Sequence, residues 1–346
     1  MSAEQNAKGI IKKRDGESDI NGHALRFCKK TTYERKGMLY KDWLLDWLKN
    51  YVMPSLKDKT YNSYRDIVFN HLIPKLGEYS IDELSPLIVQ RFVTELSQSG
   101  NIKTGKGLSP STVNAIITVI QGSIATANML GITDRYEMDK IRRPKSREKP
   151  VECFTPSEQK LIEQAVMKDK REKMKGVVVC LYTGLRIGEL LALEWSDINF
   201  QKAELTVSKT CHDGKNKNGT FCRITDTPKT SHSRRVIPLP KQLLPLLKEM
   251  KKKSQSPLVI SGRKGVVSVR SYQRSFELLQ KSLGIERKGF HALRHTFATR
   301  AIECGMDIKS LSEILGHKNP MVTLNRYVHS LMDHKRAMMD KVGKIL

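Results

Sequence analysis

The segment from residue 142 to residue 150 constrains the fold more than any other part of the sequence. It contains five lysines and arginines and two prolines, but no aliphatic or aromatic side chain. Such a stretch has nothing to bury in a core, and this composition is typical of a linker. With 346 residues the chain is long enough for about two domains. We therefore expect one domain over residues 37–141 and another over residues 151–346.

The charge of the chain is strongly unbalanced. Sixty-one lysines and arginines face 36 aspartates and glutamates, which gives a formal net charge of +25. An excess of this size favours an anionic partner, with nucleic acid first and a membrane surface second. No apolar run is long enough to span a bilayer and the N-terminus has no secretory signal, so we expect a cytoplasmic, nucleoid-associated protein without a membrane partner. The six cysteines are scattered, which favours reduced, structural thiols.

The first domain has the pattern of a small helical bundle. Trp43 and Trp47 are four residues apart and belong to a broad apolar face, which predicts a helix there. A second helix is expected from Thr60 to about Gly77. Ser85 and Ser109 are each followed by proline, the pairing that favours a helix N-cap, so they predict the starts of a third and a fourth helix.

The second domain has a mixed pattern. Thr155 and Glu158 form a capping-box signature, which predicts a helix start. Further helices are expected toward the C-terminus. Apolar and polar residues alternate in part of the domain, which is typical of half-buried strands. Three strands are expected, near residues 203–208, 221–227 and 235–239, with a polar turn at residues 213–219.

Several groups of residues have side chains suited to phosphate chemistry. In TGLRIGELLALEW we expect an arginine, Arg186, in the first turn of a helix, with Glu189 close enough to orient it. Lys229 lies in PKT between two expected strands. His291 and Arg294 are three residues apart, so they share a helix face and together suit a phosphate. Taken singly, each group is also compatible with a surface ion pair or a structural role.

A last group lies near the C-terminus. Gly316 is expected to end one helix, and Asn319 followed by proline to begin the next. His317 follows that glycine, and Tyr327 lies ten residues further on, in a short helix. A single tyrosine is far more often a packing residue than a nucleophile.

Together these motifs resemble those of the tyrosine recombinase family, which includes the integrases of phages and conjugative transposons. The matching motifs are TGLRIGELLALEW, PKT before SRRVIPL, HALRHTFAT, LGH and the tyrosine of NRY, in the family's order and spacing. The segments WLLDWLKNYVMPSLKDKTYNSYRDIVFNHLIPKLG and LSPSTVNAIITVIQGSIATA also resemble the family's core-binding domain. The resemblance covers residues 38–346. The matched positions are Arg186, Lys229, His291, Arg294, His317 and Tyr327.

The resemblance implies a multidomain fold and a reaction. The expected fold is an all-α, four-helix core-binding (SAM-like) domain followed by a mainly α catalytic domain with a small antiparallel β-sheet. The expected function is that of a site-specific DNA recombinase, the integrase of a mobile genetic element. Such an enzyme cuts and rejoins DNA strands through a 3′-phosphotyrosyl intermediate and a Holliday junction, without metal or ATP.

The resemblance also assigns roles to the matched residues. Tyr327 is the expected nucleophile, and Arg186 and Arg294 are expected to clamp the non-bridging phosphate oxygens. Lys229 is expected to protonate the leaving 5′-oxygen, and His291 to act as general acid and base. Two further roles are expected: His317 as a hydrogen-bond partner of the phosphate, and Glu189 as the residue that positions Arg186.

The expected partners are double-stranded DNA at attachment sites and three further copies of the chain, as a homotetramer on two sites. An excisionase or a host DNA-bending protein is a further candidate. Residues 330–346 are expected to dock on a neighbouring protomer, with packing on their own domain as the alternative. Residues 1–36 are expected to be a basic arm or a remnant of an arm-binding domain. No cofactor is expected, nor a metal, because His291, His295 and His317 have no cysteine or carboxylate at ligand spacing.

Three other functions remain open at this stage. The same chemistry serves recombinases that resolve chromosome dimers or invert DNA segments. A non-catalytic DNA-binding regulator derived from an integrase would keep the fold but not the reaction. A type IB topoisomerase would relax supercoils without exchanging strands.

Overall fold

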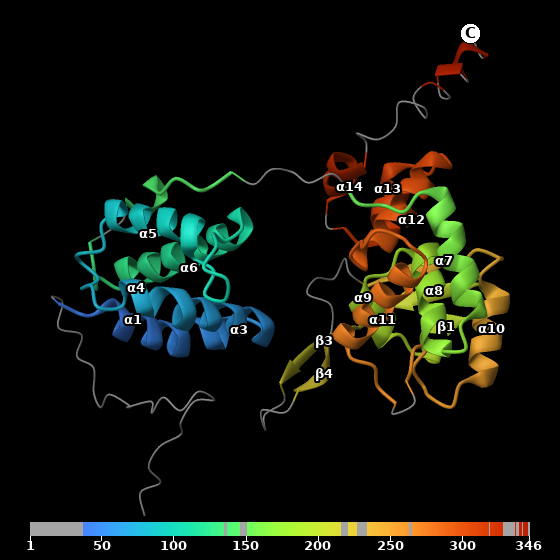
Figure 1. Ribbon diagram of the computed structural model, residues 1–346, viewed down its shortest axis with the longest axis horizontal. Helices are drawn as coiled ribbons and strands as arrows, with labels where there is room; N and C mark the ends of the chain where they lie inside the picture. Colours follow the sequence, from blue (N-terminus) through green and yellow to red (C-terminus); the bar gives the residue numbers. More distant parts are fainter. Residues whose placement is uncertain are drawn as a thin grey trace, which may run out of the picture. The chain divides into compact units, whose positions relative to one another are not determined.

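The computed structural model divides into two compact units, Met1–Arg147 and Glu148–Leu346 (Figure 1). The division falls inside the segment 142–150, whose role as a linker stays a prediction, as do the expected domain bounds 37–141 and 151–346. The structure describes residues 37–134, 137–145, 151–215, 221–226, 234–262, 265–317 and 319–327, together with a few residues between 336 and 344. The expected arm of residues 1–36 and Lys229 lie outside the described residues.

The first unit is all-helical, as expected. Ser85 and Ser109 each accept a hydrogen bond from the backbone amide three residues on, so both predicted N-caps are confirmed. The helices are α1 (Tyr40–Trp47), α2 (Met53–Ser55), α3 (Asp58–Ile67), α4 (Ile73–Leu76), α5 (Pro86–Ser99) and α6 (Pro110–Met129), with a 3₁₀ turn at Glu137–Lys140.

Two of these helices continue through a proline. The second expected helix begins at Asp58 rather than Thr60 and runs on through Pro74. A π-helical turn, Val68–Leu72, lies just before that proline, and another, Leu48–Val52, lies just before Pro54. The wider turn changes the hydrogen-bond ladder where proline cannot donate, which lets the chain remain helical.

The core of the first unit forms where α1 packs on α6. Trp43 is fully buried, and its indole nitrogen donates to the carbonyl oxygen of Ser123 at 3.0 Å. The hydroxyl groups of Tyr40 and Ser123 lie 2.7 Å apart, and the indole of Trp47 donates to Thr126 at 3.1 Å. Large aromatic rings are thus buried with their polar atoms satisfied, which stabilises one register of the two helices.

The start of the expected linker packs on the same unit. The guanidinium of Arg143 donates to the carbonyl oxygen of Asn114 at 3.1 Å and to the side chain of Gln121 at 2.6 Å. The side-chain amide of Asn114 in turn donates to the carbonyl oxygen of Pro144. The first residues of the segment are therefore fixed to α6.

The second unit is mainly helical with two small antiparallel sheets. Its helices are α7 (Pro156–Lys168), α8 (Gly176–Thr183), α9 (Ile187–Ala192), α10 (Leu244–Lys253), α11 (Val269–Ser282), α12 (His291–Glu303), α13 (Ile308–Leu315) and α14 (Pro320–Tyr327). Its strands are β1 (Ile198–Asn199), β2 (Glu204–Val207), β3 (Thr210–Lys215), β4 (Phe221–Asp226) and β5 (Arg235–Pro238).

The three expected strands are present, but they belong to two separate sheets. One sheet has the order β1-β2-β5 and pairs Leu205 with Ile237, and the other is the hairpin β3-β4. The expected polar turn at 213–219 is wrong at its start, because Asp213 to Lys215 belong to β3. The Asp213 carboxylate accepts two backbone hydrogen bonds at the start of α11, which fixes this part of the strand.

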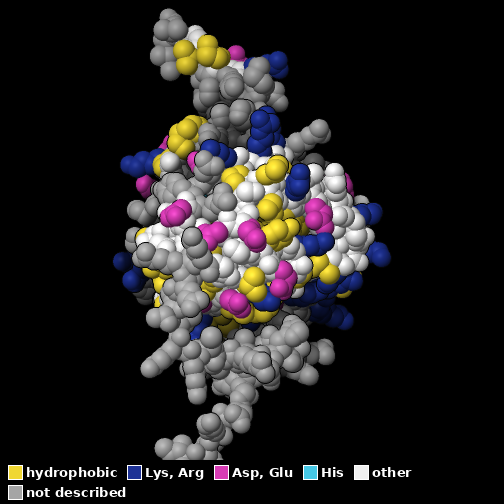
Figure 2. All heavy atoms as spheres, turned by 90° about the vertical axis from the view of Figure 1, so that its left-hand side faces the viewer, with side chains coloured by type: hydrophobic (Ala, Val, Ile, Leu, Met, Phe, Trp, Pro, Cys, Tyr) yellow, Lys and Arg dark blue, Asp and Glu magenta, His cyan; other side chains and the backbone are white. Residues whose placement is uncertain are grey.

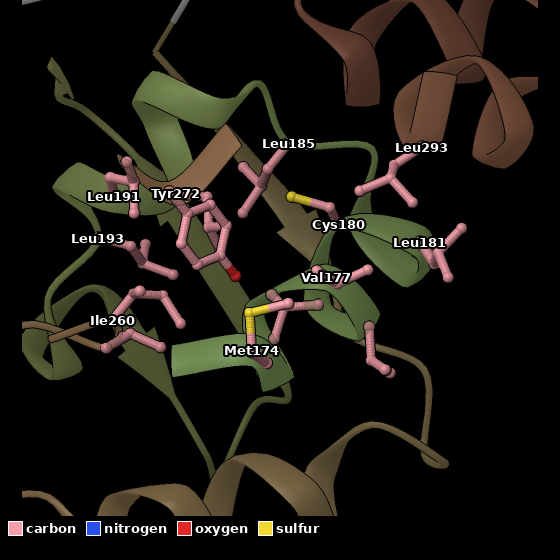
Figure 3. Packing of buried hydrophobic residues seen from close by; sticks show 14 of the residues in the cluster. Met174, Val177, Cys180, Leu181, Leu185, Leu191, Leu193, Ile260, Tyr272 and Leu293 are labelled. Carbon is pink, nitrogen blue, oxygen red and sulfur yellow. The ribbon is translucent and has the colours of Figure 1, made fainter. Parts of the chain in front are cut away.

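The core of the second unit surrounds α8, which is apolar on every side. Figure 3 shows Val177 and Cys180 of this helix among side chains from neighbouring elements, including the ring of Tyr272 from α11. The hydroxyl of Tyr272 donates to the carbonyl oxygen of Lys173 at 2.7 Å. A Cβ atom at Gly176 would lie 2.5 Å from that hydroxyl oxygen, so only glycine fits there. A helix buried on all sides gives the site a rigid base.

Figure 2 shows where charged side chains lie on one face of the molecule. In Figure 2 acidic side chains lie among basic and apolar ones over the middle of the visible face. The positive charge is therefore not spread evenly over that face. In the described part of the chain, no helix has the length and apolar character needed to cross a bilayer.

Candidate active site

The C-terminal end of α13 lies at the centre of the candidate site. Gly316 has a φ of +65°, which glycine adopts without strain, and the predicted helix end is confirmed. Its amide donates to the carbonyl oxygen of Glu313, and the amide of His317 donates to that of Ser312, both at 3.0 Å. This Schellman pattern leaves the carbonyl groups of residues 314–316 without a helical partner.

Three arginines from different elements donate to these three carbonyl groups. The pairs are Arg235 Nε to Ile314 at 2.5 Å, Arg294 Nη2 to Leu315 at 2.6 Å, and Arg186 Nη2 to Gly316 at 3.4 Å. The C-terminal end of a helix carries partial negative charge, so it stabilises cations placed there. The site is thus a cluster of arginines fixed by the backbone of one helix end.

Arg186 lies before α9 rather than in its first turn. The expectation was wrong here because Gly184, with a φ of +66°, ends α8 and Arg186 has extended backbone as the N-cap of α9. The carbonyl oxygen of Gly184 accepts a hydrogen bond from Arg294 at 2.9 Å. A Cβ atom at Gly184 would lie 2.6 Å from the ring of Phe297, so the turn packs closely on α12.

Glu189 is buried between two of the arginines. Its carboxylate accepts four hydrogen bonds, from the amide and Nη1 of Arg186 at 2.9 and 2.8 Å and from Nη1 and Nη2 of Arg235 at 3.1 and 2.8 Å. Burial alone would raise the pKa of Glu189, but the hydrogen bonds and charge of Arg235 and the charge and amide of Arg186 lower it to about 2. The group is therefore a carboxylate at neutral pH.

The side chain of His317 contacts one residue of α12 and one of α14. Its Nε2 lies 2.9 Å from Nη2 of Arg294, and its Nδ1 lies 2.7 Å from the hydroxyl of Thr323. Because a guanidinium only donates, Nε2 accepts and Nδ1 carries the proton that it donates to Thr323. Thr323 is fully buried, and Tyr327 ends α14 one helical turn further on. The expected start of this helix is confirmed, since the Asn319 side chain accepts from the second amide after it.

Of the other expected site residues, the structure describes His291 but not Lys229. His291 is exposed at the first position of α12, three residues before the buried Arg294. Its ring contacts that of His295 edge-on, with centroids 4.6 Å apart. Lys229 lies outside the described residues, between the end of β4 at Asp226 and the start of β5 at Arg235.

The sequence analysis missed Arg235. Its signal is the alternation in β5, where Ile237 faces the core with 1% exposure and Val236 faces outward with 52%. Arg235 is in phase with Ile237 and is only 8% exposed. An arginine at an inward position needs a buried anion, so this pattern alone predicts a partner such as Glu189.

The structure also shows how residues of the types that bind metal ions are arranged. Among the residues that the structure describes, no three histidines, cysteines or carboxylates are grouped so as to hold a metal ion. Cys211 lies across from Thr225 in the hairpin and Cys222 across from Gly214, so the two thiols are not cross-strand partners. What the site does offer is a cluster of guanidinium groups, whose N–H donors suit a phosphate oxyanion.

Comparison with known proteins settles the family. Residues 154–334 match the model of the phage integrase family, and residues 39–97 match its N-terminal SAM-like domain. The chain belongs to the phage integrase family. A tyrosine recombinase described as XerC-like, from Caldanaerobacter subterraneus subsp. tengcongensis, is 30% identical over 341 residues, 89% of this chain and 83% of its own.

Integrases of mobile elements are also among the relatives. The ICEBs1 integrase of Bacillus subtilis is 26% identical over 84% of this chain and 79% of its own. The transposase from transposon Tn916 of Enterococcus faecalis is 25% identical over 78% of this chain and 69% of its own. The expected enzyme class is confirmed: the protein is a tyrosine-type site-specific recombinase. The roles of individual residues stay predictions.

Solved structures confirm the expected fold class. The Tn1549 transposon integrase in complex with circular intermediate DNA has a TM-score of 0.73 at 23% identity, over 88% of this chain and 100% of its own. A lambda integrase dimer bound to a core site has a TM-score of 0.64 at 20% identity, over 84% of this chain and 78% of its own. The expected helical SAM-like domain and mainly helical catalytic domain are the fold of this recombinase.

Proposed function

We propose that this recombinase is the integrase of a mobile genetic element and that it acts on double-stranded DNA at attachment sites. The observation that carries the assignment of the site is the cluster in which Arg186, Arg294 and His317 meet at the end of α13. The names of the ICEBs1 and Tn916 relatives support a conjugative element as the source.

The reaction follows from the roles assigned to the site residues. The hydroxyl oxygen of Tyr327 attacks the scissile phosphorus, and its proton passes to His291. The bond between the phosphorus and the 5′-oxygen breaks, and this leaving oxygen takes a proton from Lys229. In rejoining, a 5′-hydroxyl attacks the 3′-phosphotyrosyl bond, Lys229 takes its proton and His291 returns one to the tyrosine. Since one ester bond replaces another, the cycle uses no ATP.

The arginines stabilise the charge that develops on the phosphate. Arg186 has a side chain that is 37% exposed, so it can reach DNA from the solvent side. Arg294 is 1% exposed, and its Nη2 shares the end of α13 with Nε2 of His317. When the phosphate binds, the guanidinium groups of Arg186 and Arg294 donate to its non-bridging oxygens. Guanidinium groups held by a helix end cost little reorganisation in the transition state.

DNA binding and assembly complete the proposal. The net charge of +25 supports contacts of both units with the phosphate backbone. A lambda integrase tetramer bound to a Holliday junction, with a TM-score of 0.62 and 20% identity, supports four protomers on two sites. In the proposed assembly, residues 330–346 of each protomer dock on a neighbour. An excisionase or a host DNA-bending protein assists, and the reaction takes place on nucleoid DNA in the cytoplasm.

The test begins with selecting bound duplexes from random DNA and converting them into nicked suicide substrates. Each substrate is incubated with wild-type protein, Y327F or Y79F in the presence of EDTA, and a denaturing gel detects covalent protein–DNA adducts. Tyr79 is a half-exposed tyrosine of the first unit, so Y79F is the matched control.

We expect an adduct with wild type and Y79F but none with Y327F, although all three bind the DNA. Binding without an adduct in the wild type would refute the catalytic assignment and favour a non-catalytic regulator. Relaxation of supercoiled DNA by monomers at random sequences, without strand exchange, would instead favour a topoisomerase.

Resolution of chromosome dimers is the second candidate function. The observation that favours it is the XerC-like relative at 30% identity. The selected sites separate the two functions: matches at the joined ends of an excised element support the integrase, whereas a single match per chromosome supports dimer resolution.

A further inference from the structure

Arg235 is buried in the candidate site, and all three nitrogens of its guanidinium are engaged. Nη1 and Nη2 donate to the two carboxylate oxygens of Glu189, and Nε donates to the carbonyl oxygen of Ile314. The residue is 8% exposed, so it is placed to act on other protein groups rather than on DNA. Bidentate pairing of this kind fixes the carboxylate in both position and orientation.

The place of Arg235 in β5 is otherwise suited to an apolar residue. Ile237 follows on the same face, and Leu239 continues the phase, with 1% and 6% exposure. A buried ion pair is often no more stabilising than well-packed apolar side chains of similar volume. Packing alone therefore gives little reason for an arginine at this position.

The surroundings of Arg235 join three segments of the site. Glu189 belongs to α9, Ile314 and Gly316 belong to the end of α13, and Arg235 itself begins β5, six residues after Lys229. A Cβ atom at Gly316 would lie 3.0 Å from Nη1 of Arg235, so the guanidinium packs directly on this glycine. A shift of any one segment would disturb the others.

We propose that Arg235 is a positioning residue for strand cleavage, which holds the Glu189 carboxylate against Arg186 and fixes the strand that follows Lys229 to the end of α13. The proposal rests on the function proposed above. It assigns to Arg235 no contact with DNA.

The charges explain why a second arginine is useful. Glu189 shares its single negative charge between Arg186 and Arg235. With Arg294, the cluster has three positive charges and one negative charge, which leaves a net charge of +2 facing the phosphate. Arg235 therefore allows an ionised Glu189 to orient Arg186 without cancelling the positive charge of the cluster.

Removal of Arg235 should also make Glu189 titrate in an accessible range. The groups that face it are Arg186 before α9, Arg235 from β5 and the thiol of Cys180 from α8, with Arg294 of α12 facing that thiol. Burial raises the pKa of Cys180 well above its usual value, with a smaller contribution from the Glu189 charge, so the thiol does not titrate near neutrality. In an R235M variant, burial would then raise the pKa of Glu189 well above 2.

The experiment measures single-turnover cleavage of a nicked suicide substrate between pH 5.5 and 9, with DNA affinity measured in parallel. The proteins are wild type, R235M, R235K, the R235M/E189Q double variant and the matched control R171M. Arg171 also pairs with a carboxylate, Asp169, but its side chain is half-exposed and lies outside the site.

At pH 7 we expect R235M to cleave roughly a hundredfold more slowly, with DNA affinity within about threefold of wild type. R235K, which keeps the charge but loses the bidentate geometry, should recover roughly tenfold. R171M should match the wild type. The rate of R235M should rise with pH as Glu189 ionises, relative to wild type, and R235M/E189Q should lose this extra rise.

Several results would overturn the inference. One is cleavage by R235M within threefold of wild type, and another is a slow R235M with the wild-type pH profile, which would indicate a purely structural role. If R235M does not fold, R235K decides, since wild-type cleavage by a folded R235K refutes a need for bidentate geometry. An absence of adduct with wild type on bound DNA would refute the proposed function itself, and the inference with it.

Discussion

Replacement of Glu189 by glutamine tests the electrostatic organisation of the site through stability rather than activity. Glutamine keeps the size and shape of the carboxylic acid but carries no charge, so it resembles the protonated glutamate. The carboxylate that it replaces is 5% exposed and accepts four hydrogen bonds, two of them from Arg235. The E189Q protein should therefore lose the stability that ionised Glu189 contributes.

The magnitude follows from the depressed pKa. Against the burial that would raise it, the hydrogen bonds and charges of Arg235 and Arg186 lower the pKa of Glu189 from 4.5 to about 2. A shift of about 2.5 units corresponds to about 3 kcal/mol of unfolding free energy at pH 7. Because the folded pKa is below the unfolded one, this contribution is present above pH 4.5 and is lost as the pH falls toward 2. At pH 3.5 about 2 kcal/mol should remain.

The assay is hydrogen exchange measured by mass spectrometry as a function of urea, which gives an unfolding free energy for each unit. Peptides from α8 report on the second unit, and peptides from α6 of the first unit are an internal control. We expect E189Q to lower the unfolding free energy of the second unit by about 3 kcal/mol at pH 7 and to leave the first unit unchanged.

Two results would refute this reasoning. A loss below about 1 kcal/mol at pH 7 would mean that the arginines do not stabilise the carboxylate. A loss that stays the same at pH 3.5 would mean that the effect comes from altered packing and not from the charge.

Three further perturbations have clear expected outcomes. G184A places a Cβ 2.6 Å from Phe297 at a φ of +66°, so the second unit should lose about 2–4 kcal/mol in the same exchange assay. D213A removes the acceptor of two amides at the start of α11 and should cost about 1–2 kcal/mol there, with an unchanged exchange rate in α6 as the control. T323V leaves Nδ1 of His317 without its hydroxyl partner, so single-turnover cleavage should fall roughly tenfold while DNA affinity holds.

Local signals in the sequence predicted the helices well. The Ser-Pro pairs at Ser85 and Ser109 and the capping box at Thr155 mark helix starts through contacts within four residues, so the sequence contains everything that forms them. The helix end at Gly316 is similar, because only glycine adopts its φ without strain. The two π-helical turns before Pro54 and Pro74 were missed, since nothing in the hydrophobic pattern distinguishes them from ordinary turns.

The sheets and the start of α9 show the limits of such signals. The strands were predicted from alternation, but their division into two sheets was not. In the second sheet, Asp213 accepts hydrogen bonds from residues more than 50 positions away in the chain, which no local pattern reveals. Arg186 was expected in the first turn of a helix, whereas it is the N-cap residue before α9. Gly184 ends α8 with a φ of +66°, and a Cβ atom there would lie 2.6 Å from the ring of Phe297 in another helix.

The candidate site was predicted from its motifs, but its internal organisation was not. Glu189 beside Arg186 follows from a spacing of three residues, and the structure brings the two together at 2.8 Å. Arg235 lies 46 residues from Glu189 and 79 from Ile314, so no local pattern connects them. What the sequence does contain is an arginine in the inward phase of a strand, a signal that a buried anion must be near.

The end of α13 explains how several distant motifs become one site. A helix end presents three unpaired carbonyl groups at fixed positions, and here each accepts a hydrogen bond from an arginine of a different element. The spacing of the guanidinium groups is therefore set by backbone geometry, which is stiffer than any contact between long side chains. Since a phosphodiester transition state is stabilised by charges that are already in place, a rigid helix end is a suitable scaffold for them. The glycine at position 316 is part of this scaffold, because a side chain there would meet Arg235 at 3.0 Å.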